Sequence, residues 1–335
     1  MQYFKDSLSN KKKVIMIALI TIVIIFLSLF IGRFNIPVLK FISGFHLNEM
    51  EKSVFFNIRL PRVLLVMGVG AALSLAGASY QSTFRNPLVS PDILGVTAGA
   101  SFGAALGMII SLQSFTMIYL FAFAFGVLAV LITYFIANLG KSNQIMMMVL
   151  SGIVVGSLFN SFISILKYVA DPYEKLPGIV FWLMGGFNRT GWGELIFAAP
   201  FIIIGIIVLF VIRWYLNVMS MGEEEAISMG VNVKLIRSVM ILFSTLMVAA
   251  SVATVGQVSW IGLVVPHISR FIVGADHKYM IPASGLLGAS TLLIMDNIAR
   301  SLTGAEIPIS IVTALLGAPF FAYLLISQKN SGWNR

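Results

Sequence analysis

The sequence predicts an all-α integral membrane protein with about ten transmembrane helices. Of its 335 residues, 59% are hydrophobic and only 10% are charged, whereas about a quarter of the residues in an ordinary soluble domain are charged. The apolar residues also form stretches, such as 14–32 and 195–215, that approach the ~20 residues needed to cross a bilayer. So few polar residues cannot cover the surface of a soluble protein of this length.

Apolar runs separated by charged or Pro/Gly-rich breaks divide the chain into ten predicted spans, which together form one transmembrane domain over residues 1–335. In chain order the spans are 14–32, 60–82, 93–111, 116–138, 144–168, 195–215, 238–256, 260–274, 281–299 and 308–326.

The first span follows Lys11, Lys12 and Lys13, a basic start that a secretory signal would share. A cleaved signal is rejected because the apolar run approaches twenty residues, lacks an A-x-A-like end and is followed by further spans. The positive-inside rule then places the N-terminus in the cytoplasm. An even number of spans returns the C-terminus, with Lys329 and Arg335, to the same side.

The second and third spans are rich in small residues, which let helix backbones approach closely within lipid. In the third span Gly95, Gly99, Gly103 and Gly107 form a stripe on one helix face, which either packs against another helix or lines a translocation path. Breaks at 85–92 and 265–267 indicate non-helical or kinked elements, since irregular backbone at membrane depth must be satisfied by protein or a water-filled cavity.

Two arginines open the second span in Arg59-Leu60-Pro61-Arg62, three residues apart on the predicted outer surface. The dipole at a helix N-terminus disfavours positive charge, so the pair is unfavourable unless a partner supplies carboxylates. Interfacial snorkelling is the alternative explanation. Further basic residues between Lys167 and Arg189 give the predicted outer side a positive excess.

The segment 217–236 is the largest charged stretch on the predicted inner side. Within it, residues 221–231 read as a short amphipathic helix that ends in glycine, with Glu223 and Glu224 in its first turn, where the dipole favours acids. A solvated loop helix is the alternative to a partner-binding one.

No nucleotide-binding or catalytic constellation is found. Gly140-Lys141-Ser142 fails as a phosphate-binding loop because Phe135 stands where the motif needs glycine. The chain has no cysteine, and His46, His267 and His277 are too far apart for a metal site. We expect no cofactor, no metal and no enzymatic activity in this subunit.

The chain resembles the FecCD-type permeases of bacterial ABC importers for iron siderophores, haem and cobalamin. The resemblance spans almost the whole chain. Its motifs are Arg59-Leu60-Pro61-Arg62, Gly70-Ala71-Ala72-Leu73, Gly77, Asn86-Pro87-Leu88, Pro91, Leu94-Gly95-Val96, Gly185, Gly230-Val231, Gly256, Gly262-Leu263-Val264-Val265-Pro266-His267, Arg270, Asp296, Ala299-Arg300, Glu306-Ile307-Pro308 and Gly317-Ala318-Pro319-Phe320.

The resemblance implies a type II ABC importer permease fold in the bacterial cell membrane. It implies a second permease, the same or a close relative, two cytoplasmic ATP-binding subunits and an extracytoplasmic substrate-binding protein, with no nucleic-acid partner. It also implies three groups of site residues: docking of the binding protein at Arg59, Arg62 and Arg300; a cytoplasmic gate at Asn86 and Leu88; and ATPase coupling through Glu223, Glu224, Ala226, Met229 and Gly230.

The expected function is inward movement of a ferric siderophore by alternating access, energised by a separate ATPase. In this family the external protein usually sets specificity, so the resemblance leaves haem and cobalamin as the nearest alternative substrates. An ion-coupled secondary transporter is a different class, but it would need ionisable groups deep within the spans. The candidates Asp92, Asp296, Lys167 and Arg270 lie near predicted ends or breaks, and Asp296 can pair with Arg300 at i, i+4.

Overall fold

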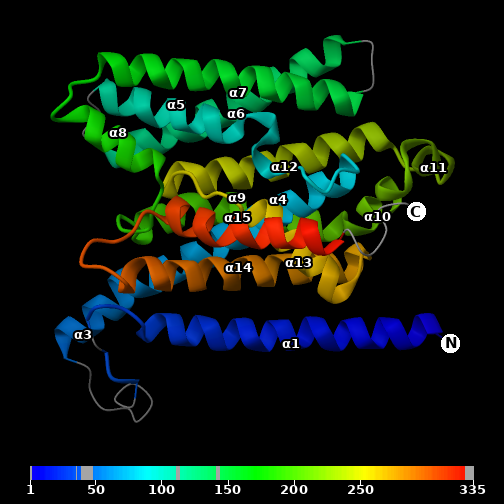
Figure 1. The fold of residues 1–335 in the computed structure, drawn as a ribbon, viewed down its shortest axis with the longest axis horizontal. Coiled ribbons are helices and arrows are strands. Elements are labelled where there is room, and N and C mark those ends of the chain that lie inside the picture. Colours follow the sequence, from blue (N-terminus) through cyan, green and yellow to red (C-terminus); the bar gives the residue numbers. More distant parts are fainter. Residues whose placement is uncertain (1, 35, 39–47, 111–113, 141–143, 329–335) are drawn as a thin grey trace.

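The computed structural model describes residues 2–34, 36–38, 48–110, 114–140 and 144–328. Within these residues the chain is helical without strands, as the sequence predicts, and most helices lie nearly parallel (Figure 1). His46, Lys141, Ser142, Lys329 and Arg335 lie outside the described residues.

The helices follow one another in a simple order. They are α1 (Gln2–Phe30), α3 (Glu49–Ser53), the π-helix η1 (Val54–Arg59), α4 (Leu60–Thr83), the 3₁₀ turn η2 (Pro91–Leu94), α5 (Val96–Ile109), α6 (Phe115–Leu139), α7 (Gln144–Val169), α8 (Lys175–Leu183), α9 (Trp192–Val211), α10 (Arg213–Met221), α11 (Glu223–Ser228), α12 (Val233–Val255), α13 (Ile261–Val273), α14 (His277–Ser301) and α15 (Ile309–Gln328).

Seven helical stretches in the described residues are long and apolar enough to cross a membrane, and α5, α13 and part of α15 are shorter apolar helices. Each predicted span overlaps one of these ten. In α4 and α12, 78% and 72% of the most apolar window is buried, against 22% in α1 and α9. α4 and α12 therefore form the centre of the bundle, whereas α1 and α9 present apolar side chains outward, as lipid requires.

Polar side chains cap the N-termini of several helices. Asn48 and Glu51 form a capping box that starts the α3–η1–α4 stretch. Asn232 accepts a hydrogen bond from the Leu235 N–H at the start of α12, and Asp276 accepts one from the Lys278 N–H at the start of α14. These side chains satisfy amides that have no partner within the helix.

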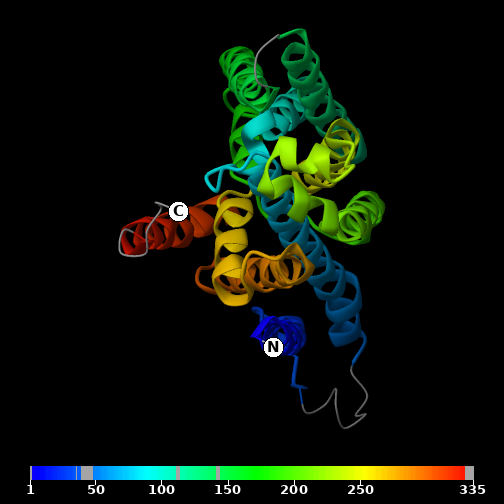
Figure 2. The same ribbon diagram turned by 90° about the vertical axis from the view of Figure 1, so that its right-hand side faces the viewer.

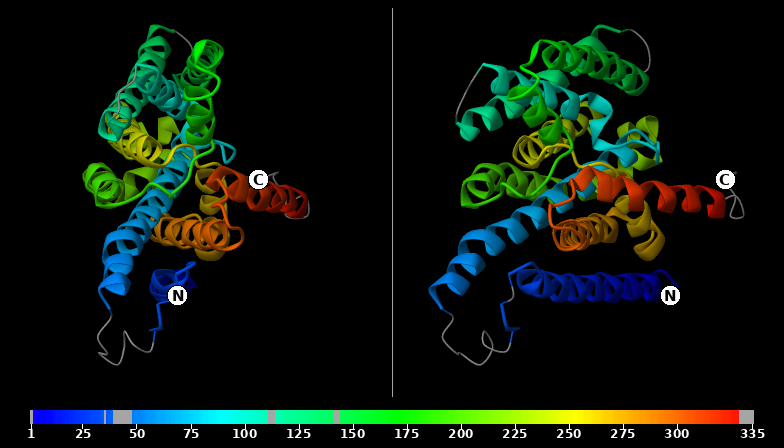
Figure 3. Two further views of the ribbon diagram at one scale, coloured as in Figure 1. Left: turned by 90° about the vertical axis from the view of Figure 1, so that its left-hand side faces the viewer. Right: turned by 60° about the vertical axis from the view of Figure 1, so that its left-hand side comes forward.

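The central helix α4 packs against α9, α12, α13 and α14. α5, α6 and α7 form a group on one side, and α1 lies against α14 on the other (Figures 1 and 3). Seen along the helices, α15 stands at the edge of the bundle (Figure 2), in contact with α13 and α14.

Glycines set the closest helix approaches. A Cβ atom on Gly77 of α4 would lie 1.8 Å from the carbonyl oxygen of Gly262 in α13. On α5, a Cβ on Gly99 or Gly103 would lie 2.4 or 2.3 Å from the α6 carbonyl oxygens of Phe125 or Phe121. Gly99 and Gly103 of the stripe are therefore used for packing against α6, where any side chain would force the backbones apart.

Only one of the two predicted breaks interrupts a helix. Between α4 and α5 the chain leaves helical geometry, with Arg85 at φ 50° and Gly95 at φ 83°. By contrast, α13 runs without interruption through Pro266. Its ring removes the hydrogen bond that the Gly262 carbonyl would accept, and the residues on both sides of it remain helical.

The bundle has two distinct ends (Figure 1). The start of α1, the end of α15, α10 and α11 lie at one end, which we call the α11 end. α3, α8 and the loop 302–308 lie at the opposite end, which we call the α3 end. The described parts of both termini thus lie on the same side of the helix bundle.

Candidate functional sites at the two ends of the bundle

At the α3 end Arg62 joins two carboxylates from distant parts of the chain. Its Nε and Nη2 donate to Asp296 of α14 at 3.2 and 2.8 Å. Its Nη1 and Nη2 donate to Glu306 at 2.8 and 2.9 Å. Arg62 is only 6% exposed, so this bidentate pairing neutralises a buried charge.

Arg59 and Arg300 stand beside this pair and bond to the end of α1. The Arg59 Nη1 donates to the carbonyls of Leu29 and Phe30 at 3.0 and 2.8 Å, where a cation complements the C-terminal end of a helix dipole. The Arg300 Nη2 donates to the Ser28 carbonyl at 2.6 Å, and its Nε lies 3.6 Å from Asp296.

The structure thus brings the three predicted docking arginines together, but it buries all of them, at 4% (Arg59), 6% (Arg62) and 5% (Arg300) exposure. The sequence indicates that Arg59 and Arg62 need carboxylates; here the same chain supplies them to Arg62, whereas Arg59 bonds to backbone carbonyls at the end of α1. The i, i+4 pair of Asp296 and Arg300 is present, although Asp296 makes its shorter contacts with Arg62. The role of Glu306 as an ion-pair partner was not predicted; its only signal was its place in the Glu306-Ile307-Pro308 motif.

Guanidinium groups outnumber carboxylates in this cluster. Burial raises the pKa of Glu306, but its hydrogen bonds to Arg62 and the charges of Arg62, Arg33 and Arg300 outweigh burial and hold the pKa below its ordinary value. Glu306 therefore stays ionised. Four guanidiniums, those of Arg33, Arg59, Arg62 and Arg300, face two carboxylates, which leaves a positive excess within this cluster.

The predicted gate residues lie in the loop between α4 and η2. The Asn86 side-chain oxygen accepts the Leu88 N–H at 2.9 Å, an Asx turn that presents Leu88 with 53% of its surface exposed. Two side chains hold the loop: His267 of α13 contacts the Pro87 carbonyl at 2.9 Å, and Gln81 of α4 donates to the Val89 carbonyl at 3.4 Å. Sequence reasoning did not identify this anchoring.

The predicted coupling segment folds as α10, α11 and the start of α12. The expectation that Ala226 faces a partner is corrected, because Ala226 is fully buried with Val218, Met219, Val231 and Val233 of the same chain. Ile227 and Met229 are 60% and 52% exposed. Glu224 and Gly230 are also exposed, and Gly230 ends the turn at φ 78°, where glycine is favoured.

Arg237 links this segment to the rest of the bundle. Its Nη2 donates to Glu223 of α11 at 2.8 Å, and its Nη1 donates to Gln144 at the start of α7 at 2.6 Å. Arg237 is 2% exposed. One buried side chain of α12 therefore ties α11 to α7.

A polar cavity of about 300 Å³ lies between η2, α5 and α7. Asp92, Ser157 and Asn160 line it and are exposed in the single chain, and Thr97 donates a hydrogen bond to Asp92. No group of three or more His, Asp or Glu in the described residues could hold a metal ion. Polar side chains at membrane depth face protein or water rather than lipid.

Comparison with known proteins gives a consistent result. The model of the FecCD transport family matches residues 20–327. The molybdate import system permease protein MolB of Haemophilus influenzae is 40% identical over 332 residues, which cover 95% of this chain and 96% of the relative. The probable iron chelatin transport system permease protein of Helicobacter pylori is 34% identical over 276 residues, which cover 82% and 83%.

A solved structure, titled "An inward-facing conformation of a putative metal-chelate type ABC transporter", has a TM-score of 0.87 and 38% identity, covering 95% of this chain and 99% of that one. The match to the family model extends over most of the chain, and 96% and 83% of the two permease relatives are covered. The chain therefore belongs to the FecCD transport family, as an ABC importer permease subunit that is not itself the catalytic ATPase.

Proposed function

We propose that this permease moves a ferric chelate into the cytoplasm by alternating access. The observation that carries the proposal is the whole-chain likeness to a metal-chelate type transporter, supported by the relative named for iron chelatin. The permease works with a second permease, two cytoplasmic ATP-binding subunits and an external binding protein. The α11 end faces the cytoplasm, so both termini are cytoplasmic.

Molybdate is the second candidate substrate. The observation that favours it is the 40% identity to a molybdate permease over nearly the full length of both chains. A ferric chelate and molybdate differ in size and metal but share negatively charged oxygen atoms, so both are compatible with a positive α3 end.

The polar cavity at Asp92, Ser157 and Asn160 is part of the translocation pathway. These side chains are exposed on the single chain, and exposure of an acid and an amide to hydrocarbon would be costly. A second permease facing α7 covers them and leaves a polar passage between the two subunits.

The binding protein docks at the α3 end through the cluster of Arg59, Arg62 and Arg300. Since Arg62 is saturated by Asp296 and Glu306, a carboxylate of the binding protein has to compete with Glu306. Glu306→Gln removes that competitor, and we expect tighter docking in a pull-down with the purified binding protein. Unchanged or weaker docking argues against a role for Arg62.

At the α11 end Asn86 and Leu88 narrow the inner mouth as an apolar constriction. Leu88→Asp should increase substrate leak without ATP from loaded vesicles, and an unchanged leak argues against the gate.

α11 is the coupling helix: Ile227, Met229, Glu224 and Gly230 contact a groove on the ATPase. Glu223 and Ala226 hold the helix to its own chain.

The decisive experiment is uptake into proteoliposomes that contain the permease. Ferric citrate and molybdate are supplied separately, each with and without the ATPase and the external binding protein. We expect ferric citrate to accumulate only when both partners and ATP are present. Uptake of molybdate alone would select the second candidate, and uptake by the permease alone under a proton gradient would reject an ATP-driven importer.

A further inference from the structure

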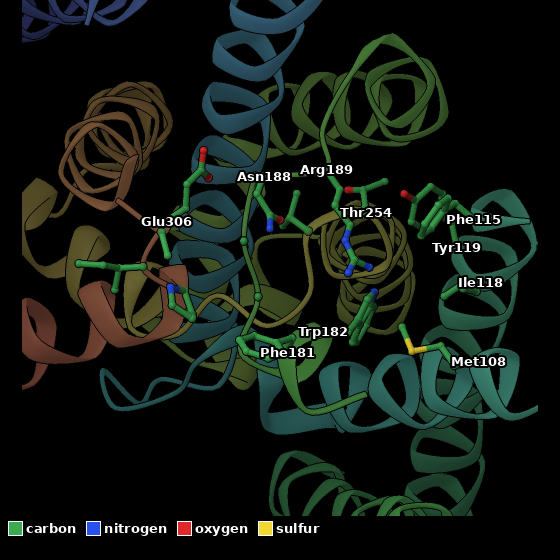
Figure 4. A pocket seen from close by; sticks show the side chains of 16 residues that line it. Met108, Phe115, Ile118, Tyr119, Phe181, Trp182, Asn188, Arg189, Thr254 and Glu306 are labelled. Atoms are coloured by element: carbon green, nitrogen blue, oxygen red, sulfur yellow. The ribbon is translucent and has the colours of Figure 1, made fainter. Parts of the chain in front are cut away.

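A pocket of about 270 Å³ opens at the α3 end, between α6, the segment 181–189 and the loop 305–308 (Figure 4). Its walls include the aromatic side chains of Phe115, Tyr119, Phe181 and Trp182. One cation, Arg189, also lines it, and Figure 4 shows its side chain extending toward Trp182. The volume admits a tetrahedral oxyanion or one lobe of a chelate, since whole drug-sized ligands occupy ~300–1,000 Å³.

The backbone beneath Arg189 is held rigidly. The Gly186 N–H donates to the Val255 carbonyl at 2.8 Å, and the Ile309 N–H donates to the Gly185 carbonyl at 3.0 Å. These bonds attach the segment to the end of α12 and the start of α15. Gly185 has φ 66°, and a Cβ there would lie 2.2 Å from the Gln257 oxygen, so only glycine fits this crossing. The pocket is therefore formed before any ligand arrives.

Arg189 has no carboxylate within 4.0 Å among the described residues, and its guanidinium lies 5.7 Å from the centre of the Phe115 ring. The nearby acids are already engaged. Glu194 accepts hydrogen bonds from the Tyr119 hydroxyl at 2.9 Å and the Gly191 N–H at 2.7 Å. Glu306, the acid in the pocket lining, is bound through both oxygens by Arg62.

Asn188 adds a second polar group with spare hydrogen-bonding capacity. Its side chain is exposed, lines the pocket beside Arg189 and makes no hydrogen bond within the described residues. A guanidinium fork and an amide, backed by aromatic walls and by the positive excess around Arg62, suit the negatively charged oxygen atoms of a ligand.

We propose that this pocket is a binding site for an anion, with Arg189 as its anchor and Asn188 as a second donor. The proposal rests on the proposed import function, because the α3 end is where an external protein would deliver substrate. The anion is either a free oxyanion or the charged oxygens of a ferric chelate, since both offer the guanidinium the same contacts.

The test uses the full-length chain in lipid nanodiscs, titrated by calorimetry with molybdate, ferric citrate and an uncharged ferric trihydroxamate. We expect Arg189→Gln to weaken anion binding at least about tenfold, because a hydrogen-bonded charge is removed. The anion affinity of Arg189→Lys should lie between those of Arg189→Gln and the unaltered chain. Lys52→Gln removes an exposed charge at the same end and should bind anions as the unaltered chain does. Quenching of the fluorescence of Trp182, absent in Trp182→Phe, locates the ligand in this pocket.

If only molybdate binds in an Arg189-dependent way, the ligand is a free oxyanion. If only ferric citrate does, the ligand is an anionic chelate. If both do, the pocket is a general anion site. The proposal is overturned if no probe binds or if Arg189→Gln binds anions normally. It is also overturned if Arg189→Gln weakens binding of the uncharged chelate as much as binding of the anions. These failures leave the proposed function intact as long as uptake still requires the ATPase and the binding protein.

Discussion

Arg62 organises the α3 end because its guanidinium connects three parts of the chain, α4, α14 and the loop 302–308. Its two acidic partners differ in exposure: the Asp296 side chain is 1% exposed and the Glu306 side chain 27%. Breaking a buried ion pair typically costs ~3–5 kcal/mol, because a charge is left unpaired. Asp296 is therefore the structural partner, and Glu306 is the partner that another carboxylate can replace.

The stability contributed by Glu306 should depend on pH. Because its folded-state pKa is lowered from 4.5, the contribution is complete above that value and disappears as pH falls through the folded-state pKa. Since Glu306 is partly exposed, we expect Glu306→Gln to lose only about 1 kcal/mol at pH 7, or ~2 °C in melting temperature. Thermal unfolding at pH 7 and at successively lower pH below 4.5 checks this, and a difference between the two proteins that does not shrink in acid contradicts it.

At the scale of elements, the α11 end offers a route from the proposed coupling helix to the proposed pathway. Glu223 of α11, Arg237 of α12 and Gln144 of α7 form one chain of hydrogen bonds, and α7 also lines the polar cavity. Because Arg237 is buried and its partners lie on separate helices, we expect a displacement of α11 to be passed to the start of α7 rather than absorbed by a flexible loop.

Arg237→Gln should uncouple the transporter. We expect the substrate moved per ATP hydrolysed to fall about tenfold while basal ATP hydrolysis persists, a magnitude typical of coupling between sites. Simultaneous uptake and ATPase assays on the reconstituted complex measure the ratio.

A matched control is Arg213→Gln. Arg213 lies at the same end and stacks on Phe210 at 3.8 Å, and it has no acid partner among the residues that the structure describes. Glu223→Gln should act like Arg237→Gln, and the double variant should be no worse than either, since all three break one link. A parallel loss of uptake and hydrolysis in the Arg237 variant would reject the coupling role.

At the scale of the whole molecule, hydropathy in the sequence predicts the fold class, because it reports which residues lipid can solvate. The break at 85–92 was also predictable from its Pro and Asn residues. The sequence does not predict the pairing of Arg62 with Glu306, 244 residues away, the uninterrupted helix through Pro266 or the inward face of Ala226. Each depends on which helices pack together, and apolar residues all around a span carry no signal of its neighbours.

Orientation is the whole-molecule property on which the proposed roles of both ends depend. The chain contains no cysteine, so a single introduced thiol reports its own side of the membrane. Gly304 lies in the exposed loop of the α3 end with nothing within 4 Å of an added Cβ, and Ser228 is exposed on α11. In intact spheroplasts we expect a membrane-impermeant maleimide to label Gly304→Cys and to label Ser228→Cys only after permeabilisation. The cysteine-free parent is the control. The reverse labelling pattern would place the α3 end in the cytoplasm, and it would reject both the docking role of the arginine cluster and the coupling role of α11.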